Sequence, residues 1–169
     1  MRKRHICLLA LPLLSTAACL DMSDQDPADG TSSQALAPRM ITDHICESFG
    51  QHFCVGAPGL AFEDPVVETP TGRVIQINPV AGGVNLALQI DPTKCVAVKN
   101  NSNLVELRAC SQPSAVWIVG NGPNGHSCVF QNQLGGVLGG PNTGAQFRVV
   151  SSDDSELFKQ FVVPMLGCT

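Results

Sequence analysis

The segment KCVAVKNNSNLVELRACSQPSAVWIV, residues 94–119, contains the pattern that decides the fold. It has an apolar start, a turn built from Asn and Ser, a second apolar run, a polar stretch and a close on Val and Trp. Asn, Ser, Gly and Pro supply the backbone angles of tight turns, and short runs of Val and Leu between such turns are typical of β-strands. The segment therefore predicts short strands joined by turns.

Runs of the same kind recur along the chain. They are VVE, RVIQI, VNLALQI, CVAV, LVEL, VWIV, CVF, FRVV and FVV, and the segments between them are rich in Gly, Asn and Pro. Helical spacing of apolar residues is almost absent, and only SSDDSELFKQF, residues 151–161, could form a helical turn or two. We therefore predict an all-β domain of many short strands.

Two other segments show the same order of features as residues 94–119. They are FCVGAPGLAFEDPVVETPTGRVIQI, from Phe53, and VLGGPNTGAQFRVVSSDDSELFKQFVV, from Val137. In this alignment the units start at Cys54, Cys95 and Leu138, about forty residues apart. Three roughly forty-residue repeats would fill the domain, as a β-trefoil requires.

The middle unit resembles the repeat of ricin-type lectin domains. The features that match are Lys94-Cys95-Val96-Ala97-Val98, Val105-Glu106-Leu107, Cys110 and Trp117. They correspond to the Cys-Leu-Asp start, the V-x-L strand, the second cysteine and the closing Gln-x-Trp of that family. The resemblance implies a disulfide-stabilised β-trefoil that binds carbohydrate, with a bridge between Cys95 and Cys110 and with Trp117 packed in the core.

The chain departs from that family at the residues that contact sugar. The Asp of Cys-Leu-Asp accepts hydrogen bonds from sugar hydroxyls, and the matching residues here are Gly56, Ala97 and Gly140. The Gln of Gln-x-Trp is replaced by Ala115 in the middle unit and by Lys159 in the third. The chain has no Tyr and a single Trp that is assigned to the core, so no exposed aromatic ring is expected for stacking on a sugar.

The function expected on these grounds is non-catalytic recognition of a glycan or glycoprotein. Loops carry the binding chemistry of such scaffolds, so the ligand-contact candidates are the turn residues Asn100, Asn103 and Asn124. A protein-protein module, such as a protease inhibitor or an envelope or toxin assembly subunit, is the alternative, favoured by the missing Asp and Gln. No G-x-S-x-G or H-E-x-x-H motif occurs, so neither an enzyme nor a cofactor is expected.

Each of the four histidines stands two residues before a cysteine. Positions i and i+2 of a strand share a face, so His44, Cys46, His126 and Cys128 would offer ligands to zinc or copper. Thiolates compete poorly with oxidation outside the cytoplasm, and we favour disulfides. Beyond the bridge that the resemblance implies, four cysteines of the mature chain have three possible pairings; Cys46 with Cys54 and Cys46 with Cys168 are both plausible on spacing, and the sequence leaves the choice open.

The first residues, MRKRHICLLALPLLSTAAC, have the basic start, short apolar run and small residues of an export signal. Thr16-Ala17-Ala18-Cys19 resembles the bacterial lipobox, which implies a lipid on Cys19; ordinary cleavage after Ala18 is the alternative. Residues 1–18 are therefore expected to be a signal, residues 19–40 a flexible acidic tether and residues 41–169 the domain. We expect an exported lipoprotein, anchored at the bacterial cell envelope, or a secreted protein.

The cysteine count predicts the number of disulfides, and the net charge limits the classes of partner. Cys7 leaves with the signal and Cys19 carries the lipid, so six of the 8 cysteines remain for three disulfides. The net charge of -4 excludes nucleic acid as an expected partner, because there is no basic patch to neutralise phosphates. A membrane would be contacted through the lipid alone.

Overall fold

The computed structural model describes residues 40–48, 53–123, 125–141, 144–154 and 158–168. The expected signal and nearly all of the tether, including Cys19, lie outside these residues. The all-β prediction is confirmed, because the described chain forms a 13-stranded sheet and two single-turn 3-10 helices, Pro113–Ala115 and Pro164–Leu166. No helix in the described ranges is long and apolar enough to cross a membrane.

The strands follow the apolar runs of the sequence closely. In chain order they are β1 Ile41–His44, β2 Cys46–Glu47, β3 Cys54–Gly56, β4 Val67–Thr69, β5 Val74–Val80, β6 Gly83–Leu88, β7 Asp91–Val98, β8 Val105–Ala109, β9 Val116–Asn121, β10 Cys128–Asn132, β11 Val137–Gly139, β12 Arg148–Val150 and β13 Phe161–Val162. Turn chemistry sets their ends. Gly82, at a φ of 84°, occupies the tight turn between β5 and β6, where a positive φ suits glycine.

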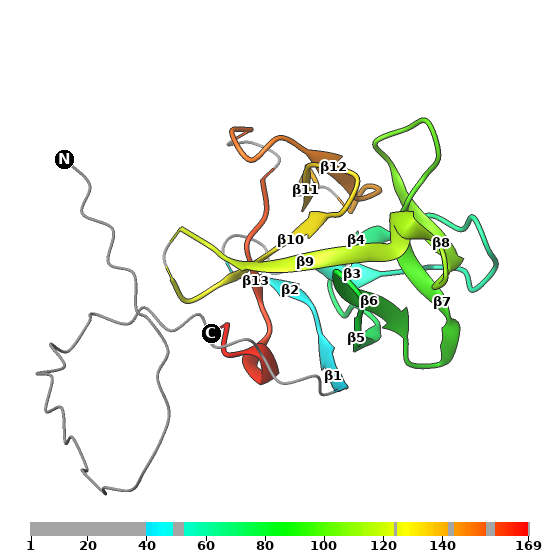
Figure 1. Ribbon diagram of the computed structural model, residues 1–169, viewed down its shortest axis with the longest axis horizontal. Coiled ribbons are helices and arrows are strands. Elements are labelled where there is room, and N and C mark those ends of the chain that lie inside the picture. The colour runs from blue at the N-terminus through cyan, green and yellow to red at the C-terminus, as the bar shows by residue number, and fades with distance from the viewer. Residues whose placement is uncertain (1–39, 49–52, 124, 142–143, 155–157, 169) are drawn as a thin grey trace, which may run out of the picture. The chain divides into compact units, whose positions relative to one another are not determined.

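Antiparallel pairing closes part of the sheet on itself. β1 pairs with β5, β5 with β6, β6 with β9, β9 with β10, β10 with β13 and β13 with β2 (Figure 1). Only Ile45 separates β2 from β1, so this path returns to its own start. Within this path β5, β6, β9, β10, β13 and β2 each pair with a strand on both sides, whereas β1 pairs with β5 alone.

The remaining strands form three hairpins, β3–β4, β7–β8 and β11–β12. Three backbone hydrogen bonds join them in a ring. The amide of Val66 donates to the carbonyl of Val105 (3.0 Å), that of Val105 to Phe147 (2.9 Å), and that of Phe147 to Val66 (2.8 Å). These three residues are about forty positions apart, so the same backbone contact recurs once in each hairpin.

Strand register corrects the sequence alignment by one residue. The hairpins present equivalent pairs next to the hydrogen-bonded ring: Gly56 with Val67, Ala97 with Glu106, and Gly139 with Arg148. In this register Gly139, and not Gly140, occupies the place that Gly56 and Ala97 occupy in their hairpins. Both Val137 and Leu138 are buried and two glycines follow them, so the apolar pattern did not distinguish the two registers.

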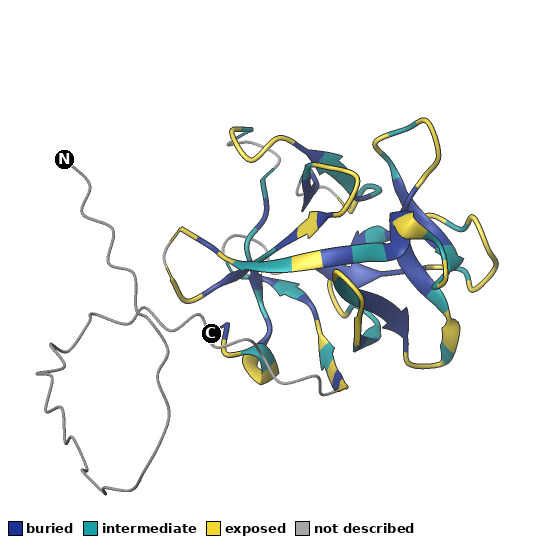
Figure 2. Ribbon diagram, in the orientation of Figure 1, coloured by how far each residue is buried: buried dark blue, intermediate teal, exposed yellow. Residues whose placement is uncertain are grey.

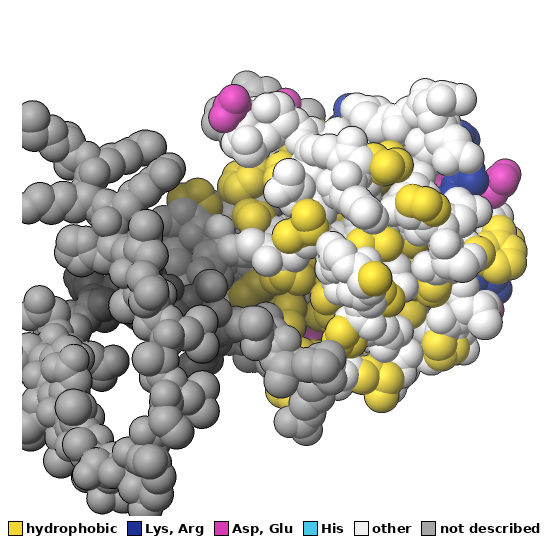
Figure 3. Space-filling model, viewed as in Figure 1, with side chains coloured by type: hydrophobic (Ala, Val, Ile, Leu, Met, Phe, Trp, Pro, Cys, Tyr) yellow, Lys and Arg dark blue, Asp and Glu magenta, His cyan; other side chains and the backbone are white. Residues whose placement is uncertain are grey.

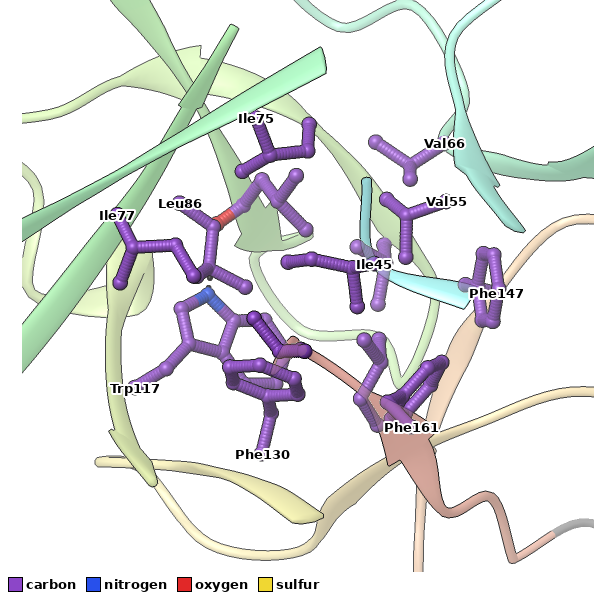
Figure 4. Packing of buried hydrophobic residues seen from close by; sticks show 14 of the residues in the cluster. Ile45, Val55, Val66, Ile75, Ile77, Leu86, Trp117, Phe130, Phe147 and Phe161 are labelled. Carbon is purple, nitrogen blue, oxygen red and sulfur yellow. Dashed lines mark hydrogen bonds between the residues drawn. The ribbon is translucent and has the colours of Figure 1, made fainter. Parts of the chain in front are cut away.

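Aromatic and aliphatic side chains fill the interior of the sheet (Figures 2 and 4). Trp117 is fully buried, as the resemblance implies, and its Nε1 donates to the carbonyl of Val96 at 2.8 Å. Phe130 and Phe161 meet edge to face with ring centroids 5.6 Å apart, and Phe147 is buried beside them. Edge-to-face packing adds to the stabilisation from area burial, so this cluster fixes the strands that carry the loops.

Three disulfides staple the domain. They join Cys46 to Cys54, Cys95 to Cys110, and Cys128 to Cys168. For Cys46, the structure thus has the first of the two pairings that the sequence left open. Cys46 and Cys128 belong to different bridges and have no thiolate to offer a metal ion, so the zinc or copper hypothesis is wrong for this oxidised form.

The helical turn predicted within residues 151–161 falls partly on residues 155–157, outside the described ranges. Within the described part of this segment, the amide of Phe158 donates to the carbonyl of Asp154 at 2.8 Å, and β13 begins at Phe161. The two 3-10 turns lie elsewhere, and both begin with a proline, which suits the first position of a helical turn.

Candidate functional site

A shallow groove lies between the loop that joins β7 to β8 and the turn that joins β10 to β11. It has a volume of about 570 Å³ and is lined by Val98, Lys99, Asn100, Asn101, Ser102, Asn103, Leu134, Gly135 and Val149. Both segments reach the same side of the domain in Figure 1, at the ends of their hairpins. The predicted contact residues Asn100 and Asn103 meet here, whereas Asn124 lies outside the described residues.

Backbone hydrogen bonds hold the Asn-rich loop in one shape. The amide of Lys99 donates to the carbonyl of Leu104 at 2.8 Å, and the amide of Ser102 donates to the carbonyl of Lys99 at 3.2 Å. Asn101 has a φ of 57°, a left-handed conformation that Asn tolerates better than most residues. The carbonyl of Asn103 accepts from the amide of Val149 at 2.6 Å, which ties the loop to β12. These three hydrogen bonds fix the loop, and Asn100, Asn101 and Asn103 on it are exposed.

The chemistry of the groove suits a neutral ligand with many hydroxyl groups. Each Asn amide offers a donor and an acceptor, and Leu134, 65% exposed, adds an apolar surface. The cation of the groove, Lys99, has its Nζ 3.7 Å from Oε2 of the buried Glu106, so part of its charge is balanced. Figure 3 likewise shows mainly uncharged side chains over the middle of one face of the domain.

The positions that match the lectin Asp offer no replacement for it. Gly56, Ala97 and Gly139 are buried within their strands and carry no acceptor side chain. Glu106, opposite Ala97 in the ladder, is a carboxylate at nearly the right place. However, it is 1% exposed and contacts the guanidinium of Arg108 as well as Lys99, so its oxygens are already engaged.

The expectation that no aromatic ring is exposed is wrong. Phe62, in the loop between β3 and β4, is 53% exposed. A second cavity, of about 190 Å³, lies against it and is lined by Phe62, Glu63, Arg108, Ala109 and Gln112. The sequence signal was present in PGLAFEDP, residues 58–65, where apolar residues stand between two prolines in a segment that reads as a turn.

Comparisons with known proteins address the fold. No family model matches the sequence, and no curated protein matches it. Among solved structures, the chain is similar to part of a mosquitocidal holotoxin, with a TM-score of 0.63 and 12% sequence identity. The similarity covers 73% of this chain but only 17% of the toxin chain, so it is a likeness in fold to a small part of a much longer protein.

Proposed function

We propose that residues 41–169 form a β-trefoil of the ricin-type lectin kind that recognises a glycan or glycoprotein without catalysis. The closed path of strands and the three hairpins support the trefoil, as does the spacing of about forty residues between Val66, Val105 and Phe147, which join the hairpins. The likeness in fold to a toxin segment is consistent with a recognition module. Fold alone does not determine function, so the proposal depends on the groove.

The observation that carries the proposal is the set of exposed amides along a rigid loop. Asn100, Asn101 and Asn103 lie within four consecutive positions of a loop that is held by backbone hydrogen bonds to Leu104 and to β12. Because this loop is already fixed, little conformational entropy is lost when a ligand binds. An open groove gives weak single contacts, so binding to multivalent glycans is expected to exceed binding to free monosaccharides.

A glycan array probed with the exported full-length protein tests this function, after intact mass has shown three disulfides. Selective binding that free sugar displaces is the expected result. The double variant Asn100→Ala/Asn103→Ala should lose that binding, whereas Asn121→Ala, an exposed Asn outside the groove, should retain it. A blank array from folded, oxidised protein would refute the lectin proposal.

A protein partner is the second candidate, and exposed aliphatic side chains favour it. Ile118 in β9 is 45% exposed and Val80 at the end of β5 is 36% exposed, and both strands flank β6. Aliphatic residues exposed on neighbouring strands resemble the core of a protein interface more than a sugar site. Under this candidate, stoichiometric inhibition of a protease would be lost in Ile118→Glu and unaffected by Asn100→Ala/Asn103→Ala.

We also propose that residues 1–18 direct export and that a lipid on Cys19 anchors the protein at the cell envelope. The basic start, the apolar run and the small residues before Cys19 support this proposal. Mass spectrometry of the N-terminal peptide from exported protein should find a diacylglycerol adduct, and Cys19→Ser should release the protein from the membrane fraction. An unmodified Cys19 in membrane-associated protein would contradict the anchor.

A further inference from the structure

We propose that Phe62 is the platform of a second sugar-contact site, where a neutral pyranose ring of a bound glycan stacks on the phenyl ring. The inference rests on the proposed glycan recognition and assigns it a separate contact, away from the Asn-rich groove. Phe62 lies in the loop between β3 and β4, drawn in teal at the right-hand edge of Figure 1. Hydrophobic, basic and acidic side chains meet at that edge in Figure 3.

A cation lies over one face of the ring. Nζ of Lys94 lies over the Phe62 ring, 5.2 Å from its centroid, within the range of a cation–π interaction. The same Nζ lies 2.5 Å from Oδ2 of Asp91, and Oδ1 of Asp91 accepts from the hydroxyl of Thr93 at 2.6 Å. The lysine is therefore anchored, and it orients the ring. The adjacent cavity is lined by Phe62 itself together with Arg108 and Gln112, and Lys94 is not among its lining residues.

The loop itself is held by hydrogen bonds to its own residues and to β8. Oδ2 of Asp64 accepts from the amide of Ala61 at 2.7 Å. The amide of Glu63 donates to the carbonyl of Leu107 at 2.7 Å, and the amide of Leu107 donates to the carbonyl of Asp64 at 2.9 Å. Glu63 has a φ of 70°, a left-handed backbone that this docking to β8 maintains. An exposed aromatic ring on a loop fixed in this way is prearranged for stacking.

The cavity beside the ring has the size and polarity for one sugar ring. Its volume of about 190 Å³ is below the roughly 300–1,000 Å³ of sites for drug-sized ligands, so it holds a small cyclic group and not a large one. The Gln112 amide offers a donor and an acceptor, and the Glu63 carboxylate, 74% exposed, offers acceptors for hydroxyl groups. Polar groups around an exposed aromatic face match a pyranose, which has an apolar face and a rim of hydroxyls.

Charge balance favours a neutral sugar over a phosphate or sulfate. Lys94 is paired with Asp91. The Arg108 guanidinium contacts the buried Glu106 and has Glu63 at 4.0 Å. Neither cation is left without a carboxylate partner, so an anionic ligand would have to displace an existing ion pair.

The test measures binding of the full-length exported protein and its variants to methyl β-glycosides of glucose, galactose and N-acetylglucosamine. Saturation-transfer NMR with competition gives the affinities. Phe62→Leu keeps an apolar side chain without the aromatic face and should weaken binding roughly tenfold, whereas Phe62→Trp should preserve or strengthen it. Leu60→Ala, an exposed aliphatic residue on the same loop, is the matched control and should leave the affinity unchanged.

The outcomes separate this inference from the function on which it rests. If wild type binds a glycoside and Phe62→Leu binds equally well while Asn100→Ala/Asn103→Ala does not, the stacking site is refuted and the lectin function stands. If folded, oxidised wild type binds neither these glycosides nor any arrayed glycan, both proposals fall. If Phe62→Leu instead abolishes protease inhibition without changing sugar binding, Phe62 is a protein contact and the sugar site is wrong.

Discussion

The three disulfides differ mainly in the length of chain that each one closes, and this difference predicts their order of importance. Cys46–Cys54 spans 8 residues of sequence, Cys95–Cys110 spans 15, and Cys128–Cys168 spans 40. A crosslink stabilises the fold mainly by restricting the unfolded chain, and the entropy that it removes rises with the logarithm of the loop length. Removing the disulfide that closes the longest loop should therefore lower the free energy of unfolding the most.

The loop lengths give the magnitudes directly. The chain-entropy relation gives about 2.5 kcal/mol for the 8-residue separation, about 3 kcal/mol for 15 and about 4 kcal/mol for 40. The double variant Cys128→Ala/Cys168→Ala should thus be less stable than Cys46→Ala/Cys54→Ala by about 1.4 kcal/mol, a tenfold difference in the unfolding equilibrium. Both variants remove the same atoms, so much of the lost packing cancels in this comparison.

Urea unfolding at equilibrium, followed by circular dichroism, measures these free energies. Free energies extrapolated to water should be compared rather than midpoints, because losing a crosslink expands the unfolded state and changes the slope. The reasoning would be refuted if the 8-residue bridge proved as costly as the 40-residue bridge. In that case packing around Cys54, which is 5% exposed, would dominate over chain entropy.

Three further predictions concern the core and the ion pairs. Lys159→Met removes the buried cation that lies 2.9 Å from Glu47 and 3.5 Å from Glu68, and should lower the free energy of urea unfolding by about 3–5 kcal/mol. The half-exposed control Lys99→Met should lower it by about 1 kcal/mol or less. An equally small effect of Lys159→Met would contradict a structural role for the buried cation. Trp117→Phe loses the hydrogen bond to the Val96 carbonyl and should cost about 1–3 kcal/mol by circular dichroism, and a neutral effect would count against that bond. Hydrogen bonding to Lys94 lowers the pKa of Asp91 to about 2 from 3.8, so the stability that Asp91 adds is present above pH 3.8 and lost as the pH falls through 2. The difference in unfolding midpoint between wild type and Asp91→Asn should therefore shrink over that window, and a constant difference would contradict the linkage.

The fold was readable from sequence because turn residues and apolar runs alternate so regularly. Each of the nine apolar runs overlaps a strand, and Trp117 occupies the core as the resemblance implied. The apolar pattern does not indicate β1 and β2, because ITDHICE mixes charged and apolar residues over a few positions. Their place in the closed path depends on pairing with β5 and β13, which are distant in sequence. Local periodicity does not report such pairings.

The candidate sites were only partly readable. Asn100 and Asn103 were found because turn tips project from such scaffolds, but Leu134 comes from a different hairpin and joins them only through the fold. Phe62 was missed because an apolar residue is assigned to the interior by default, and its exposure depends on how the β3–β4 loop docks on β8. The buried charge of Lys159 was not predicted because a charged residue is assigned to the surface by default. Lys159 is 4% exposed because it has carboxylate partners, which no local pattern reveals.

The hydrogen-bonded ring of Val66, Val105 and Phe147 consists only of peptide groups. A peptide amide and carbonyl are the same whichever side chain the residue carries, so these hydrogen bonds require only that none of the three residues is proline, while burial requires each side chain to be apolar. Exchanges among apolar side chains can therefore accumulate at these buried positions while the three hairpins stay joined. Such tolerance allows the surface of each hairpin to diverge on its own, and it accounts physically for a recognisable architecture in a sequence that matches no family model.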